Sequence, residues 1–374
     1  MKKNNDRSSL SCLFTLLCVS VLIVGISQTA SADIVPYKPG AKASMKTGIN
    51  ATIEVMASTH AISEVRDAIE AVRQGNHATA VPVLEKHAKK GDIGATFVLA
   101  KLHQAGLGVE KSEKIAADYL QSNADSGHAP SLIALGEIRE QSNPAEAMTL
   151  YKKAAAKGDA TGYLKLGDIF ERGLFGKKAN PKLAFSNYEK AAKAENAAGL
   201  FHMARCYDKG IGTSPNELLA TRTFLKSALK GFALAQVKMA RRYYEGKGLE
   251  QDPIAAFGWL SLASQSGSTE AMILLGRRYE SGDIIPQNLD LAGQLYSKAA
   301  KRGDPTGKYY LALLYANGKG TKQDLVRAYI LLHSSAKSLP MAKEALGKLE
   351  PNLTDTQKDE AEKRIAQADA KKAG

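Results

Sequence analysis

The sequence predicts an all-α protein built as an α-solenoid, in which short antiparallel helix pairs stack along the chain. The first observation is a glycine that recurs at intervals of 36, 31, 73, 36 and 36 residues, the interval of 73 holding two periods. The second is that each interval contains two helical patterns separated by a loop. A fixed period of this length with helix–loop–helix content is typical of stacked repeats. The recurring glycines are Gly91, Gly127, Gly158, Gly231, Gly267 and Gly303.

The stretch 233–268 shows one repeat most clearly. Its first helix has small and large apolar residues at helical spacing and ends at the glycine loop 246–248. Asp252 followed by Pro253 has the pattern of a helix N-cap and a first helical position. The second helix carries a stripe of alanines together with Trp259. Neither helix can bury its stripe alone, so the repeat needs neighbours on both sides.

The pattern divides the chain into five segments. A leader and a linker rich in proline and glycine precede a helix pair that lacks the glycine loop, and a second pair without that loop closes the array. One repeat, 129–159, has a shortened central loop. The segments are a signal peptide (1–32), a linker (33–50), an N-terminal capping helix pair (51–92), seven repeats (93–340), and C-terminal capping helices with a tail (341–374).

The leader has the three parts of a secretory signal peptide. A basic region containing Lys2 and Arg7 precedes an apolar run of 17 residues, 10–26, and residues 30–32 form an A-x-A cleavage site. The mature chain is predicted to start at Asp33. An uncleaved membrane anchor is the alternative, but the run is short for a span. We therefore predict a periplasmic or secreted protein with no membrane span after cleavage.

The cysteine count indicates whether disulfides can form, and the net charge indicates which class of partner is favoured. Cys12 and Cys18 leave with the leader, so the mature chain keeps only Cys206, which stands in an apolar column of the first helices and is predicted to pack in the core. No disulfide framework is predicted. Loss of the leader lowers the formal charge from +13 to +11. In an exported protein this charge favours acidic protein surfaces or anionic envelope polymers over nucleic acid.

The repeated pattern A-x-A-x-x-x-L-G-x-x-Y-x-x-G-x-G, followed by D-x-x-x-A-x-x-W/Y-x-x-x-A-A-x-x-G, resembles the Sel1-like repeat family, which is related to TPR repeats. The resemblance covers roughly 93–340. It implies a right-handed superhelix with a concave surface and an adaptor function. The cysteine-rich branch of that family has a cysteine pair in each repeat, so its properties do not carry over to this chain. Matching residues in one repeat are Ala271, Leu275, Gly276, Tyr279, Gly282, Asp290, Ala292, Tyr296, Ala299, Ala300 and Gly303.

No catalytic, cofactor or metal motif is found in the sequence. It has no G-x-S-x-G, no P-loop and no paired-carboxylate motif. The seven histidines are scattered, with no pair at i, i+4 beside a carboxylate. The G-x-G loops follow helices, whereas a dinucleotide site requires them to follow a strand. We predict a protein that is not an enzyme and that binds neither cofactor nor metal.

One column of basic residues is the predicted partner-binding site. Arg205, Arg241 and Arg277 occupy the same position of three successive first helices, nearly opposite the buried stripe. Stacked repeats would place them in a ladder with rungs about 10 Å apart, with Arg242 and Arg278 beside it. Such a ladder fits a carboxylate-rich partner or an anionic glycan. An ordinary solvated helix face is the alternative interpretation.

The aromatic residues of the second helices are predicted to pack between repeats, because they recur at corresponding positions. They are Tyr119, Tyr151, Tyr188, Trp259, Tyr296 and Tyr329.

The predicted function is that of an exported, non-enzymatic adaptor that binds a protein partner in the cell envelope through a solenoid groove. Two alternatives are kept: direct binding of anionic envelope polysaccharide or peptidoglycan, and secretion as a host-interaction factor.

Overall fold

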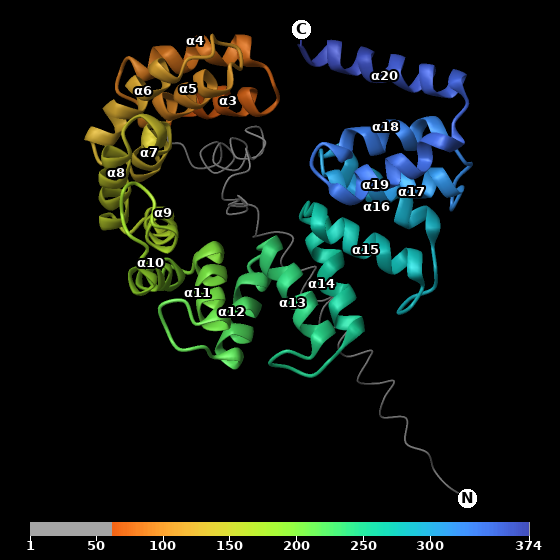
Figure 1. Cartoon of the computed structure of the whole chain (residues 1–374). Helices are drawn as coiled ribbons and strands as arrows, with labels where there is room; N and C mark the ends of the chain where they lie inside the picture. Colours follow the sequence, from red (N-terminus) through yellow and green to blue (C-terminus); the bar gives the residue numbers. More distant parts are fainter. Residues whose placement is uncertain (1–61, 374) are drawn as a thin grey trace, which may run out of the picture. The chain divides into compact units, whose positions relative to one another are not determined.

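The computed structural model describes residues 62–373. The predicted signal peptide, the linker and residues 51–61 of the N-terminal capping pair lie outside the described residues, as does Gly374. Within 62–373 the chain forms eighteen α-helices and one short 3-10 helix, and this part contains no strand (Figure 1). The prediction of an all-α fold is confirmed.

Helices follow one another in pairs, and each repeat consists of a first helix and a second helix. An N-terminal pair, α3 (Ser63–Arg73) and α4 (His77–Ala88), precedes the repeats. Repeats 1 to 7 are α5 (Ile93–Ala105) with α6 (Glu113–Asp125), α7 (Ala129–Ser142) with α8 (Pro144–Ala156), α9 (Ala160–Arg172) with α10 (Pro181–Lys193), α11 (Ala197–Lys209) with α12 (Glu217–Leu229), α13 (Ala233–Glu245) with α14 (Pro253–Gln265), α15 (Thr269–Ser281) with α16 (Leu289–Lys301), and α17 (Pro305–Asn317) with α18 (Leu325–Ala336).

The repeats belong to two compact bodies. The N-terminal body ends at Phe232 and contains repeats 1 to 4, and the C-terminal body begins at Ala233 and contains repeats 5 to 7. Within each body the two helices of a repeat pack against each other, and the second helix packs against the first helix of the next repeat. First helices also touch the first helix of a neighbouring repeat, as α9 does α11 and α15 does α17. In the N-terminal body α5, α7 and α9 lie on the inner side of the curve, with α6, α8 and α10 outside (Figure 1). The first helices of that body therefore share one surface.

Local sequence explains where these helices begin and end. The first helices of most repeats start at an Asp, Asn or Ser whose side-chain oxygen accepts a backbone N–H of the first turn, as Asp92 and Ser268 do. A left-handed residue, a conformation that glycine favours, closes each of repeats 1 to 6. At the end of repeat 3, which lacks that glycine, Glu195 takes the left-handed conformation with φ 56°. Its carboxylate pairs with Lys230 at 3.0 Å.

Repeat 2 lacks the glycine loop and turns in a single residue. Asn143 is both the C-cap of α7 and the N-cap of α8, where its side chain accepts the Glu146 N–H. Pro144 at the first position of α8 needs no hydrogen-bond acceptor there.

The core consists of small residues and rings between successive helices. Tyr151, Tyr188 and Tyr296 are fully buried, as predicted. Trp259 packs against the core only partly buried, because Leu260 holds the buried position that corresponds to the three tyrosines. Cys206 is 1% exposed, which confirms its predicted core position. Burial raises the pKa of its thiol to about 12.

Two helices close the C-terminal body. These helices, α19 (Pro340–Leu349) and α20 (Asp355–Ala373), are joined by a 3-10 turn, Glu350–Asn352. Thr354 and Gln357 form a reciprocal capping box at the start of α20. Both helices pack on α18, so the last repeat does not end on an open apolar face.

Candidate functional site

The first helices of three repeats carry copies of one polar arrangement. In repeats 2, 3 and 6 a buried tyrosine of the second helix donates its hydroxyl hydrogen bond to a glutamate of the first helix. The same three repeats have a glycine four residues before that glutamate. The hydrogen bonds join Tyr151 Oη to Glu140 Oε1 (2.7 Å), Tyr188 Oη to Glu171 Oε2 (2.7 Å) and Tyr296 Oη to Glu280 Oε2 (2.9 Å).

The glycine is required because the tyrosine ring lies against the first-helix backbone. A Cβ atom at Gly136, Gly167 or Gly276 would come within 2.4–2.6 Å of the ring of its partner tyrosine. Real Cβ contacts are longer, so any larger residue must push the ring away. We call these the glycine-type repeats. The other four are alanine-type, with the buried pairs Ala100 and Leu120, Ala204 and Phe224, Ala240 and Leu260, and Ala312 and Leu332.

The following repeat covers each tyrosine ring with a residue at one fixed position of its first helix. Lys165 places its Nζ 5.5 Å from the centroid of Tyr151. His202 stacks on Tyr188 with ring centroids 4.7 Å apart, and Tyr310 stacks on Tyr296 at 5.2 Å. The arrangement therefore joins two repeats, and the covering residues are Lys165, His202 and Tyr310.

Charges around these rings are paired within the chain. Lys165 Nζ lies 2.9 Å from Glu137 and 3.3 Å from Glu140. Burial tends to lower the pKa of Lys165, but the two carboxylates outweigh it and raise that pKa. The pKa of His202 falls to about 4, chiefly because the ring is buried and secondly because Arg205 is close.

Arg205 is half-buried, and its guanidinium forms hydrogen bonds within its own chain. Its Nη2 donates to Glu171 of the preceding repeat at 2.7 Å, and its Nη1 donates to His202 Nδ1 at 3.0 Å. Burial opposes ionisation of Glu171, yet the Tyr188 hydroxyl and Arg205 together hold the pKa of this carboxyl below its usual value. Arg205 thus ties repeat 3 to repeat 4.

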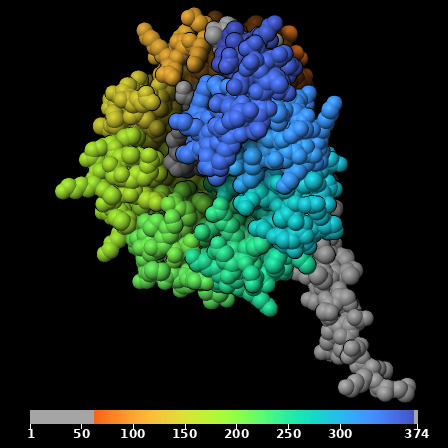
Figure 2. All heavy atoms as spheres, turned by 45° about the vertical axis from the view of Figure 1, so that its right-hand side comes forward, coloured from red at the N-terminus to blue at the C-terminus, as the bar shows by residue number. Residues whose placement is uncertain are grey.

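Arg241 and Arg277 are the two predicted arginines that the structure places on the surface. Both are exposed, and they occupy the same position of α13 and α15. In Figure 2 the surfaces of these two successive repeats form adjoining bands, coloured from teal to light blue. Arg241 pairs with Glu270 of the next repeat, although both side chains stay about half exposed, at 55% and 44%. Arg277 lies 5.7 Å over the ring of Tyr310. Within one body the predicted ladder is therefore the Arg241–Arg277 pair.

Arg242 was predicted to lie beside that ladder, and this part of the prediction is wrong because Arg242 is only 1% exposed. It stands in the core column that Leu102 and Leu314 hold in other repeats. There its Nη1 donates to the backbone oxygen of Lys247 at 3.0 Å, which anchors the glycine loop. The side chain cannot reach a partner.

Arg278 occupies the same column but is half-exposed, with its side chain 30% accessible. Its guanidinium lies 4.2 Å over the ring of Tyr244, and Nη1 donates to Asp283 at 2.8 Å. Two internal partners hold it in place, so it contributes less free charge to the surface than Arg241 or Arg277.

The described residues meet the requirements of neither a metal site nor a membrane-spanning helix. In residues 62–373 no three His, Cys, Asp or Glu side chains are grouped so that they could hold a metal ion. None of the described helices combines the length and the apolar character needed to cross a membrane.

Comparisons with known proteins agree with this architecture. The Sel1 repeat family model matches seven segments: 94–128, 134–159, 160–196, 197–232, 233–268, 269–304 and 305–338. No curated protein matches the chain.

Many solved structures resemble the chain, and among them are two with a TM-score above 0.5 and at least 25% identity. A Sel1 repeat protein from Oxalobacter formigenes is 26% identical with a TM-score of 0.54, and the match covers 64% of this chain and 97% of that one. A protective antigen of uropathogenic Escherichia coli strains, which displays an SLR fold, is 25% identical with a TM-score of 0.52, covering 87% of this chain and 72% of that one. Sel1 repeat proteins are generally protein-interaction scaffolds. The seven matches span most of the chain, which therefore belongs to the Sel1 repeat family.

Proposed function

We propose that the protein is an exported, non-enzymatic adaptor that binds an acidic protein partner in the cell envelope. Membership of a family of interaction scaffolds supports the adaptor function, and the leader 1–32 supports export. The formal charge of +11 after removal of that leader supports an acidic partner.

The observation that carries the proposal is the exposed pair Arg241 and Arg277. Arg205, Lys165 and Arg241 all have carboxylate partners within the chain, but the side chains of Arg205 and Lys165 are only 27% and 13% exposed. Arg241 keeps more than half of its side chain in solvent. A guanidinium in that position can form bidentate hydrogen bonds with a carboxylate of a second protein.

In-cell cross-linking of the tagged protein tests this site. The double variant Arg241→Glu/Arg277→Glu is compared with the wild type and with Lys152→Glu/Lys153→Glu, a matched charge reversal at two exposed residues of α8. We expect a discrete protein adduct in the wild type and the control that is lost in the arginine variant. An adduct present in all three contradicts the arginine site but leaves the adaptor. Retention on cell-wall polymer without any protein adduct contradicts the adaptor and favours glycan binding.

Cell fractionation and N-terminal sequencing test the export step. We expect the protein outside the cytoplasm with Asp33 as its first residue. Intact Met1 on a cytoplasmic protein would contradict the proposed location.

A further inference from the structure

Second helices of three repeats differ at one position that faces the next repeat. Four residues after the first residue of the helix, repeats 3 and 5 have Phe185 and Phe257, whereas repeat 6 has Gly293. Each phenylalanine packs edge to face on a tyrosine of the following first helix. The pairs are Phe185 with Tyr207 (centroids 5.5 Å apart, interplanar angle 73°) and Phe257 with Tyr279 (5.6 Å, 79°).

The tyrosine of this pair is retained after repeat 6, but the phenylalanine is not. Tyr315 on α17 stands where Tyr207 and Tyr279 stand on α11 and α15. Gly293 offers it no ring. A Cβ atom at Gly293 would meet only Leu314 Cδ1, at an ordinary 3.5 Å. No neighbour therefore demands a glycine, although glycine weakens a helix interior.

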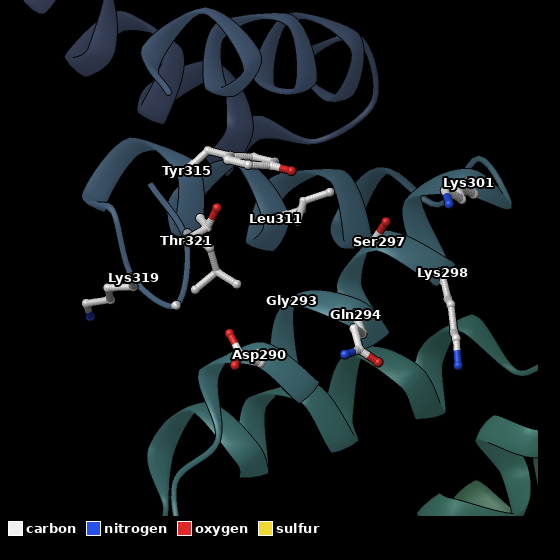
Figure 3. A pocket seen from close by; sticks show the side chains of 12 residues that line it. Asp290, Gly293, Gln294, Ser297, Lys298, Lys301, Leu311, Tyr315, Lys319 and Thr321 are labelled. Atoms are coloured by element: carbon white, nitrogen blue, oxygen red, sulfur yellow. The ribbon is translucent and has the colours of Figure 1, made fainter. Parts of the chain in front are cut away.

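A pocket of about 470 Å³ lies at this place. Its volume is within the range of natural ligand sites. In Figure 3 the Tyr315 ring lies across one side and α16, with Asp290 and Gly293, lies on the other, so the open space is between them. Arg327 of α18 holds the Tyr315 ring from a further side, 5.6 Å from its centroid.

The rim of the pocket is basic. Lys298 and Lys301 line it from α16, and Lys319 lines it from the glycine loop of repeat 7, against a single carboxylate, Asp290. All three lysines are exposed. An apolar ring inside and a net positive rim favour an occupant that is aromatic and flanked by negative charge.

We propose that this pocket binds an aromatic side chain from an acidic segment of the partner protein, which takes the place that Phe185 and Phe257 fill in the sister repeats. The inference rests on the proposed function, because it assigns a second contact to the same adaptor.

Peptide binding to the full-length mature protein tests the pocket. The probe is the heptapeptide Glu-Asp-Glu-Phe-Glu-Asp-Glu, and its control has alanine at the centre. We expect the phenylalanine peptide to bind about tenfold or more tightly than the alanine peptide, since burying a ring exceeds the free energy that corresponds to a factor of ten. Equal affinity for the two peptides, or no binding of either, overturns the proposal.

Two variants at one position make the test specific. Gly293→Phe supplies the ring found in repeats 3 and 5, so we expect it to fold, to raise the melting temperature and to abolish the preference for the phenylalanine peptide. Gly293→Ala adds one methyl group in open space, so it should also raise the melting temperature while the preference remains. Unchanged peptide preference in Gly293→Phe, with circular dichroism showing native helix content, contradicts the pocket.

The in-cell cross-linking experiment separates this inference from the adaptor itself. An adduct that persists in Gly293→Phe at wild-type yield shows that the partner does not need the pocket, and the adaptor stands without it. Absence of any protein adduct in the wild type overturns the adaptor, and the peptide result then decides the pocket by itself.

Discussion

Glycine-type and alanine-type repeats bury the same face with different pairs of residues. In repeat 3, Gly167 admits the ring of Tyr188, and the hydroxyl reaches Glu171. In repeat 5, Ala240 adds a methyl group and Leu260 replaces the ring, with no hydroxyl to satisfy. Both pairs are almost completely buried, with exposed fractions of 1–2% for Ala240, Leu260 and Tyr188.

The comparison teaches that the pair, rather than either residue, is the unit of packing. A smaller residue on the first helix is always matched by a tyrosine on the second. The tyrosine ring also contacts the next repeat, because the first helix of that repeat places Lys165, His202 or Tyr310 over the ring. Glycine-type repeats are therefore joined to their neighbours by polar contacts as well as apolar ones.

The largest expected effect is that of Tyr188→Ala. Truncation leaves a cavity beside Gly167 and removes the donor to Glu171, so we expect a loss of about 3–5 kcal/mol in the free energy of unfolding. Urea denaturation followed by hydrogen exchange of repeats 3 and 4 measures it. Tyr188→Phe, which keeps the ring, is the control and should lose less than half as much stability. An equal loss in the two variants would show that the hydroxyl hydrogen bond, and not the packing of the ring, accounts for the stability.

The second largest effect is expected at acidic pH, where the boundary between repeats 3 and 4 should lose stability. Because the folded pKa of His202 is lowered from 6.5 to about 4, the unfolded chain takes up the proton first as the pH falls. The stability that neutral His202 contributes is present above pH 6.5 and is lost toward pH 4. We expect about 2 kcal/mol to be lost between pH 7 and pH 5.

Urea midpoints of the wild type and His202→Phe over that pH range measure this effect. The variant keeps a ring on Tyr188 without a titrating group, so its pH dependence should be shallower. Parallel curves would exclude His202 as the source.

A smaller loss is expected when a glycine-type repeat receives an alanine alone. In Gly276→Ala the new Cβ lies 2.6 Å from Tyr296 Cε1, and we expect a net loss of about 1–2 kcal/mol after the gain in helix propensity. Adding Tyr296→Leu completes the alanine-type pair, so the double variant should be more stable than the sum of the single changes. Thermal melts of the four proteins give the coupling, and strict additivity would break the distinction between the two repeat types.

The smallest effect is a gain. Gly293→Ala should stabilise the protein by about 0.5–1 kcal/mol, since alanine favours the helix and its Cβ has room. A thermal melt beside Gly276→Ala measures the contrast. Destabilisation by both alanines would mean that the pocket next to Gly293 is closed in solution.

Much of the fold could be predicted from the sequence because its determinants are local. The 36-residue period, the capping residues such as Ser268 and Asp304, and the helical spacing of apolar residues all act within one repeat. The left-handed Glu195 was missed, because only its backbone takes over the role of the missing glycine. The signal peptide prediction depends on residues outside the described part and stays a prediction.

The site was predicted less completely, because exposure at the edge of a helix stripe is decided by the neighbouring repeat. Arg241 and Arg242 are adjacent in sequence and about 100° apart around the helix, yet one is exposed and the other is 1% accessible. The only sign of the glycine–tyrosine–glutamate arrangement in the sequence is that the three residue types occur together, at corresponding positions, in repeats 2, 3 and 6.

The pattern of residues along the chain is sufficient to identify an array of helix pairs and the family to which the chain belongs. Tertiary structure decided which charges stay in solvent and where a pocket remains, because the packing of one repeat on the next either covers a side chain, as at Arg205, or leaves space beside it, as at Gly293. Contacts of that kind form only when two repeats are stacked, so no single repeat contains the information.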